Sequence, residues 1–216
     1  MMLPVTAPRS LKEKQRQERE ELILQAAEEV LAEKGYYETS VDEIASRVGI
    51  AKGTVYLHFP SKEDLVIAIL ERNAQKLLEL VETAVALAPT NREKLEAIMR
   101  VFYSGFFDPR TSYLMRLPYT VVNSSDLRRV FVEKKGCMHD KWERLDILIE
   151  SILEDGKAAG EFDQTLPTPI MSSAFLSLLS PRGFERLNIN DRISLDEFAT
   201  QLGRLYFKGI AAIQRD

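Results

Sequence analysis

The sequence predicts an all-α protein made of a small N-terminal unit of three helices and a larger helical part. Apolar residues recur at steps of three and four along most of the chain, which is the spacing of one helix face. No segment alternates apolar and polar residues as a half-buried strand does. Prolines, glycines and polar turn residues divide the helical pattern into separate segments.

The chain begins with a predicted flexible basic tail over residues 1–16. Two prolines and no apolar period precede Leu11. Glutamates are interspersed among the cations of this region, which are Arg9, Lys12, Lys14, Arg16 and Arg19. This mixture favours a solvated helix start. An arm that reaches the phosphates or the minor groove of DNA stays open as an alternative.

A first helix is predicted up to Lys34. Its apolar face consists of residues spaced by three and four, namely Leu22, Ile23, Ala26, Ala27, Val30 and Leu31. We expect Gly35 to end the helix, because glycine readily adopts the left-handed conformation of a C-cap. At least one of Tyr36 and Tyr37 is expected to fill the small core beneath the next helices.

Two short helices joined by a tight turn come next. Ser40 and Glu43 have the spacing of a capping box, in which the serine oxygen accepts from the Glu43 amide and the glutamate reaches back. Gly49 allows a turn with positive φ, and a third helix over 51–59 precedes Pro60. The inward-facing side chains of the second helix are expected to be Val41, Ile44, Ala45 and Val48.

The rest of the chain is predicted as a series of longer helices. Ser61 caps the first of them, with Asp64 three residues further on. Proline-containing and polar breaks separate the helices, for which we expect the ranges 62–88, 91–107, 112–122, 125–159, 168–180 and 194–214.

Composition argues against several classes of protein. With 29 Lys and Arg against 33 Asp and Glu, the net charge is −4, which disfavours indiscriminate DNA coating because that affinity comes from cations. The apolar runs are far shorter than the ~20 residues of a membrane-spanning helix, and no signal peptide is recognisable. Cys137 is the only cysteine, so no internal disulfide forms. We expect a cytoplasmic protein without a membrane partner.

One window of the chain nevertheless suits contact with DNA. No Asp or Glu occurs from Ile44 to Lys62, although acids flank this window on both sides, and chance alone can produce such a gap. Two short helices joined by a glycine turn, after a longer helix, lay the second short helix in a major groove. We therefore predict a helix-turn-helix reading motif over about 40–59.

The stretch VDEIASRVGIAKGTVYLHFPSKEDL closely resembles the DNA-binding domain of the TetR (tetracycline-repressor-like) family. The resemblance starts at about Gln17 and beyond residue 80 is one of length and helical layout. It implies a DNA-binding domain over 17–77 and a helical effector-binding and dimerisation domain over 78–216. The family usually has Ser or Thr where this chain has Ala51, so a helix cap worth ~1 kcal/mol is missing.

The resemblance also implies a set of DNA-contacting residues: Thr39, Ser40, Lys52, Gly53, Thr54, Tyr56, His58 and Lys62. Tyr56 and Thr54 carry hydroxyls that can donate to phosphate oxygens, and Lys52 can reach a phosphate or the edge of a guanine. For His58, contact with DNA and packing within the domain both stay open. Gly53 allows close approach of the backbone.

In such regulators the C-terminal helices form an effector pocket and a two-fold interface. We expect a small apolar or aromatic effector in a pocket lined by Tyr103, Phe106, Phe107, Tyr113, Met115 and Trp142. For the dimer interface we expect Phe175, Leu178, Leu179, Leu202, Leu205 and Tyr206. Packing into the chain's own core is the open alternative for both sets.

The predicted function is that of a repressor, which binds a palindromic double-stranded DNA operator as a homodimer and is released by the effector. Activation stays open. An enzyme is the main rival, because Cys137, His139 and Asp140 bring a thiol, an imidazole and a carboxylate together. Neighbours one or two apart on a helix point in different directions, however, so we expect neither a catalytic site nor a metal or cofactor. A helical dimer that acts through protein contacts alone is the second rival.

Overall fold

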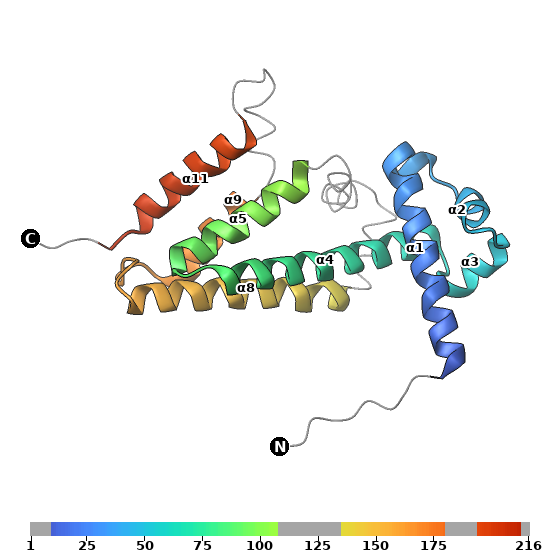
Figure 1. Cartoon of the computed structure of the whole chain (residues 1–216), viewed down its shortest axis with the longest axis horizontal. Coiled ribbons are helices and arrows are strands. Elements are labelled where there is room, and N and C mark those ends of the chain that lie inside the picture. Colours follow the sequence, from blue (N-terminus) through green and yellow to red (C-terminus); the bar gives the residue numbers. More distant parts are fainter. Residues whose placement is uncertain (1–9, 108–134, 180–193, 213–216) are drawn as a thin grey trace, which may run out of the picture.

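The computed structural model describes residues 10–107, 135–179 and 194–212. Its N-terminal bundle contains α1 (Leu11–Glu38), α2 (Val41–Val48) and α3 (Lys52–His58). A second bundle follows (Figure 1), made of α4 (Lys62–Leu87), α5 (Asn91–Phe107), α8 (Lys135–Ala158), α9 (Thr168–Leu178) and α11 (Leu195–Ile210). In these ranges a single antiparallel bridge, between Phe162 and Ala211, is the one β feature. The all-α prediction is confirmed.

Two hydrophobic cores hold the bundles together, and α4 belongs to both. Its first turns contribute Leu65, Val66, Ile67, Ile69 and Leu70 to the N-terminal core. Its later turns contribute Leu78, Val81 and Val85 to the C-terminal core. Because interiors are packed to crystal-like density, the two cores fix the two ends of one continuous helix.

Polar contacts attach the middle of α1 to α4. The Arg72 guanidinium of α4 lies 2.6 Å from a Glu21 oxygen and 2.5 Å from a Glu28 oxygen. The Asn73 amide donates to Glu28 at 3.0 Å. The Arg72 side chain is only 12% exposed, so removing either glutamate that holds it would leave a partly buried charge without full compensation.

The N-terminal boundary differs from the sequence prediction. Helix α1 begins at Leu11, within the segment expected to be a flexible tail up to residue 16, and this agrees with the solvated helix start that the mixture of charges favoured. The reason is a capping box: the Ser10 amide donates to the Glu13 carboxylate at 2.8 Å, and the Glu13 amide donates to the Ser10 hydroxyl at 3.3 Å.

The other end of α1 follows the prediction in part. Gly35 has φ +79°, which interrupts the helix, and a short helical stretch then continues to Glu38. Tyr36 is buried in the N-terminal core, whereas Tyr37 is 75% exposed. Of the predicted helices, 112–122 and the first part of 125–159 lie outside the described residues.

In the C-terminal bundle, two buried tyrosines attach α9 to its neighbours. The Tyr103 hydroxyl of α5 donates to the Leu178 carbonyl at 2.5 Å, and the Tyr206 hydroxyl of α11 donates to the Met171 carbonyl at 2.8 Å. Burial raises the pKa of Tyr103 to about 12 and raises that of Tyr206 further. Both hydroxyls therefore stay protonated donors, which satisfy backbone carbonyls inside the bundle.

Candidate nucleic-acid interface

The turn between α2 and α3 presents α3 at the surface. Gly49 adopts φ +75°, and its amide donates to the carbonyls of Ala45 and Ser46. The Ile50 amide then donates to the Ala45 carbonyl at 3.0 Å. Val55 is 1% exposed and anchors α3 in the N-terminal core, so the opposite side of α3 faces outward.

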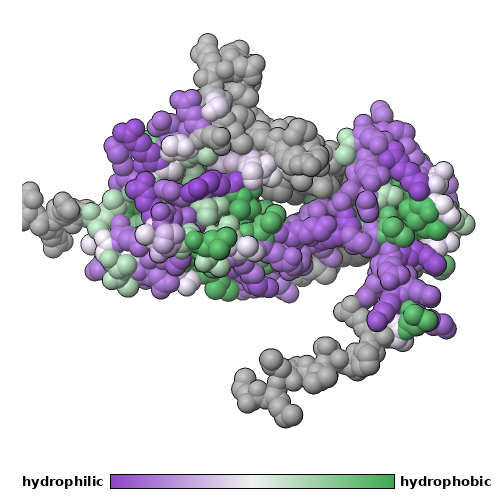
Figure 2. Space-filling model, in the orientation of Figure 1, coloured by the Kyte–Doolittle hydropathy of each residue, from purple (hydrophilic) through white to green (hydrophobic). Residues whose placement is uncertain are grey.

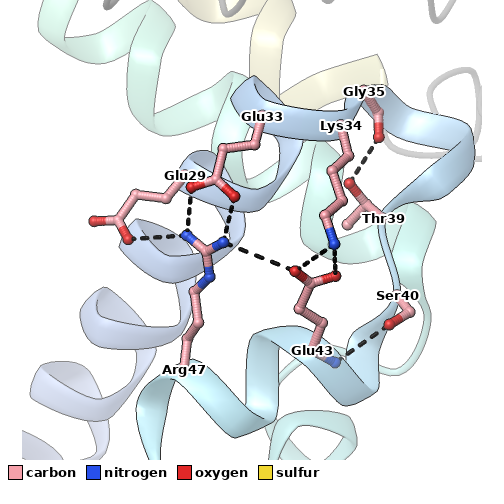
Figure 3. A network of polar contacts seen from close by, with 8 residues as sticks. All are labelled: Glu29, Glu33, Lys34, Gly35, Thr39, Ser40, Glu43 and Arg47. Carbon is pink, nitrogen blue, oxygen red and sulfur yellow. Dashed lines mark hydrogen bonds and ion pairs between the residues drawn. The ribbon is translucent and has the colours of Figure 1, made fainter.

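A network of ion pairs holds α2 against α1 (Figure 3). The Arg47 guanidinium pairs with Glu33 and lies 3.5 Å from Glu29 and 3.7 Å from Glu43. Lys34 pairs with Glu43 at 2.8 Å. Arg47 is therefore directed toward acids of the protein rather than toward a DNA phosphate.

The predicted capping box at the start of α2 is half right. The Glu43 amide donates to the Ser40 hydroxyl at 3.2 Å as expected. The Glu43 carboxylate binds Lys34 and Arg47 (Figure 3) instead of reaching back to Ser40. A full positive charge attracts it more strongly than a neutral amide does. Thr39 is 4% exposed, and its hydroxyl donates to the Gly35 carbonyl at 2.7 Å.

The outward side of α3 carries the predicted reading residues. Lys52 and Gly53 are exposed, Tyr56 is 41% exposed and Thr54 is half-buried. Lys52 is paired with Asp42 at 2.6 Å, a contact that raises the pKa of its amine. As expected from Ala51, no side chain caps the start of this helix.

His58 is turned back toward α1. Its Nδ1 lies 3.0 Å from a Glu20 carboxylate oxygen, and its side chain is 8% exposed. Burial alone would raise the pKa of Glu20, but hydrogen bonds to His58 and Arg16 outweigh burial and lower it. The structure thus places His58 in a contact between α3 and α1, in line with the packing role that the sequence left open. The partner Glu20 could not be predicted, because the two residues lie far apart along the chain.

Lys62 also has a partner inside the domain. Its amine lies 4.3 Å from the centre of the Tyr36 ring, a cation–π contact, and burial lowers the pKa of this amine. The Tyr36 hydroxyl donates to Glu63 at 2.6 Å. Lys62 and Glu63 therefore join the first turn of α4 to the end of α1.

The predicted effector-pocket residues do not form one described cavity. Tyr103 is a core residue. Trp142 is 42% exposed and lies beside a small cavity between α4, α5 and α8 that Leu77 and Phe102 also line. The side chains of Phe106 and Phe107, and all of Tyr113 and Met115, lie outside the described residues.

The predicted interface residues divide into two groups. Phe175, Leu179 and Tyr206 are buried in the chain's own core, because α9 packs on α8 and α11, with the ring centres of Phe175 and Tyr206 5.3 Å apart. Leu178 and Leu202 are half-buried, and Leu205 is 70% exposed. Ile170 of α9, which does not belong to the predicted set, is 63% exposed.

Chemistry of other kinds finds little support in the part of the chain that the structure describes. There, no three His, Cys, Asp or Glu side chains are grouped as a metal site would require. None of the helices in that part has the length and apolar character needed to cross a membrane. Of the group at Cys137, the described side chains are His139 and Asp140, and both are exposed.

A three-helix unit with an outward-facing third helix, followed by an all-helical bundle, defines a helix-turn-helix DNA-binding protein. The profile described as "Bacterial regulatory proteins, tetR family" matches residues 23–69. The fatty acid metabolism regulator protein of Bacillus subtilis is 28% identical over 144 residues, which are 67% of this chain and 71% of that protein. The HTH-type transcriptional activator FasR of Mycolicibacterium smegmatis is 39% identical, and the match covers 40% of that protein. The HTH-type transcriptional regulator EthR of Mycobacterium tuberculosis is 34% identical, and the match covers 42% of that protein.

Solved structures share the whole described architecture. A transcriptional regulator of the TetR/AcrR family from Thermobifida fusca gives a TM-score of 0.70 at 25% identity, over 92% of this chain and 100% of that chain. FadR from Bacillus subtilis, solved in complex with stearoyl-CoA, gives 0.69 at 23% identity over 88% and 98%, a likeness of fold. Residues 23–69 therefore form a DNA-binding domain of the TetR type, and the chain is similar over most of its length to DNA-binding transcriptional regulators.

The paired carboxylates predict how the stability of the DNA-binding domain depends on pH. Burial raises the pKa of Glu63, but hydrogen bonds with Tyr36 and its own neighbours outweigh burial and lower it, as at Glu20. A lowered folded-state pKa contributes stability above the ordinary value of 4.5, which is lost as the pH falls through the folded value. Glu20→Gln/Glu63→Gln should lower the free energy of unfolding at pH 7 by about 0.5–1 kcal/mol.

Urea unfolding followed by circular dichroism at pH 7 and pH 3 measures this. The difference between the parent chain and the double variant should shrink at pH 3, because this pH lies below the ordinary pKa of 4.5 and the contribution of the two carboxylates is lost as the pH falls. Glu38→Gln is the control, because Glu38 is exposed and forms no hydrogen bond or ion pair in the described ranges. An equal difference at both pH values contradicts the assignment.

Proposed function

We propose that the chain is a repressor that binds a palindromic operator as a homodimer and is released by a small-molecule effector. The observation that carries this proposal is the outward face of α3, where Lys52, Gly53 and Tyr56 are exposed on a rigid scaffold. Repression by blocking polymerase is favoured because the sequence shows no acidic activation surface or polymerase-binding segment.

Lys52, Thr54 and Tyr56 are the proposed reading residues. Lys52 can exchange Asp42 for a DNA phosphate or a guanine edge at little cost, because an exposed ion pair is weak and screened by salt. Tyr56 and Thr54 supply hydroxyl donors for phosphate oxygens, and Gly53 lets the duplex approach the backbone closely.

The flanking residues are proposed to act in different ways. Ser40 lies at the exposed N-terminus of α2, where amides and the helix dipole favour a phosphate. Thr39 stabilises this end of α2 from the interior, because its hydroxyl donates to the Gly35 carbonyl. His58 and Lys62 lie at the margin of the surface, and each must give up Glu20 or Tyr36 in part to reach DNA.

Substitution on α3 tests the DNA contact. Lys52→Ala and Tyr56→Phe should each weaken binding to the operator about tenfold, because each removes a donor to phosphate or base. Fluorescence anisotropy measures the Kd with a labelled duplex that carries a site found by footprinting the purified chain on genomic DNA. Lys76→Ala, an exposed lysine of α4, removes the same charge away from α3 and should leave the Kd unchanged. Equal Kd values for all variants would support regulation through protein contacts alone.

The proposed two-fold interface uses the exposed faces of α9 and α11. On α9 the exposed residues Ile170, Ser173, Ala174 and Ser177 recur at steps of three and four, and small side chains allow helices to approach closely. Leu205 is an exposed apolar residue of α11. Two copies of this face can form a four-helix contact, and a dimer places two α3 helices on half-sites roughly 34 Å apart.

A charge placed on this face tests the dimer. Leu205→Glu should convert the dimer into a monomer, because a carboxylate buried in an apolar interface lacks a partner. Sedimentation velocity measures the mass. Leu80→Glu is the matched control, because Leu80 of α4 is 60% exposed and outside the face. A variant of dimeric mass, or a parent chain that is monomeric, contradicts the proposed interface.

The effector is proposed to act near Trp142 and to move α4. The cavity beside Trp142 has a volume of only about 10 Å³, close to the space of one water, so an effector must push α4 and α8 apart. A shift of α4 reaches the DNA-binding domain through Arg72 and its glutamates. The aromatic residues at 103, 106, 107 and 113 and the methionine at 115 are proposed to complete the site.

Trp142 is the only tryptophan of the chain. The tryptophan fluorescence of the protein therefore reports on the surroundings of this one side chain. Stearoyl-CoA, the molecule bound by the similar FadR of Bacillus subtilis, should change the Trp142 emission and weaken operator binding over the same concentration range. Equal half-points for the two signals are expected because one binding event causes both. Choline serves as a comparison ligand of unlike chemistry. An emission change with unaltered DNA affinity would contradict release through this site.

A further inference from the structure

The first turns of α1 carry a row of cations beside α3. Lys12, Arg16 and Arg19 follow one another at steps of four and three residues, so they share one face of the helix. With Gln15 they line one wall of a groove of about 370 Å³, and Leu57 and His58 of α3 line the other. We call Lys12, Arg16 and Arg19 the α1 row. It precedes residues 23–69, which the family profile matches.

This part of α1 is held in place relative to α3. The capping box at Ser10 and Glu13 starts the helix at Leu11. Arg16 pairs with Glu20 at 3.0 Å, and the same carboxylate oxygen lies 3.0 Å from His58. The α1 row therefore has a fixed position beside the end of α3 instead of belonging to a flexible tail.

The neighbouring acids offset the charge of Arg16 but not that of the rest of the α1 row. The Glu13 carboxylate is bound to the Ser10 amide, and that of Glu20 to Arg16 and His58. Lys12 and Arg19 are exposed and form no ion pair within residues 10–107, 135–179 and 194–212. Figure 2 shows that the part of α1 projecting past the bundle is mainly hydrophilic.

The groove opens onto the reading surface. Leu57 is 79% exposed and lies one turn after Gly53, so it belongs both to the outward face of α3 and to the groove wall. A duplex seated on α3 therefore continues past Leu57 toward α1. Figure 1 shows the N-terminal part of α1 extending beyond α3 in this direction.

We propose that the α1 row binds phosphates of the operator backbone that flank the base pairs read by α3. The inference rests on the proposed DNA binding by α3 and adds a second contact of its own. Charge complementarity carries it, because Lys12 and Arg19, which have no acidic partner among the described residues, lie on a fixed helix and release counterions when they meet phosphates. The row adds affinity and register without reading sequence.

The salt dependence of binding tests the α1 row. The full-length variant Lys12→Ala/Arg19→Ala should bind the footprinted duplex more weakly, and its slope of log K against log[salt] should become less steep by about 0.9 for each phosphate that is no longer neutralised. Arg16 is left intact because its pair with Glu20 supports His58. The matched control is Lys14→Ala/Lys76→Ala, which removes the same charge from exposed positions. Lys14 is two residues from Lys12 and Arg16 and points away from the row.

Hydroxyl-radical footprinting of the same complexes locates the contact. Loss of protection at the outer phosphates of each half-site, with protection at the centre kept, supports the proposal. Equal slopes and equal footprints for the two double variants overturn it, even when the parent chain binds its site. A parent chain that shows no preference for any duplex overturns the proposed function itself, so the two failures are distinguishable. Stronger loss of binding to anionic lipid vesicles than to DNA would assign the row to a membrane surface and also overturn it.

Discussion

The rest of the structure depends on the membership of one helix in two hydrophobic cores. Leu65 to Leu70 pack α4 into the DNA-binding domain, and Leu78 to Val85 pack the same helix into the C-terminal bundle. Dense packing at both ends prevents either end from moving alone. A displacement of α4 in one bundle is therefore transmitted to the other, which is what an effector-responsive regulator requires.

Polar contacts between α4 and the other helices of the DNA-binding domain fix the orientation of the reading surface. Arg72 attaches α4 to α1 through Glu21 and Glu28. Helix α1 in turn holds α2 through the acids around Arg47 and holds α3 through Glu20 and His58. Helices α2, α3 and α4 are thus each attached to α1 by polar contacts. The two residues expected at the DNA edge, His58 and Lys62, also serve this internal framework.

Local signals in the sequence predicted the helices well, because caps and turns are set by neighbouring residues. Ser61 with Asp64 and the positive φ of Gly49 are such cases. The Ser10 capping box shows the same spacing, but the prolines and the missing apolar period before Leu11 favoured a tail. Contacts between distant residues could not be predicted. The residues around Glu43 do not indicate that its carboxylate pairs with Lys34 and Arg47. The residues around Tyr206 do not indicate that its hydroxyl donates to the Met171 carbonyl. Helical periodicity marks an apolar face but not whether the chain's own core or a second copy covers it.

Footprinting of the purified chain on genomic DNA tests the central claim most directly. The account predicts protected sequences made of two inverted half-sites whose centres lie roughly 34 Å apart, as two symmetric α3 helices require. Protection no stronger than on random fragments, or a single unpaired half-site, would contradict it.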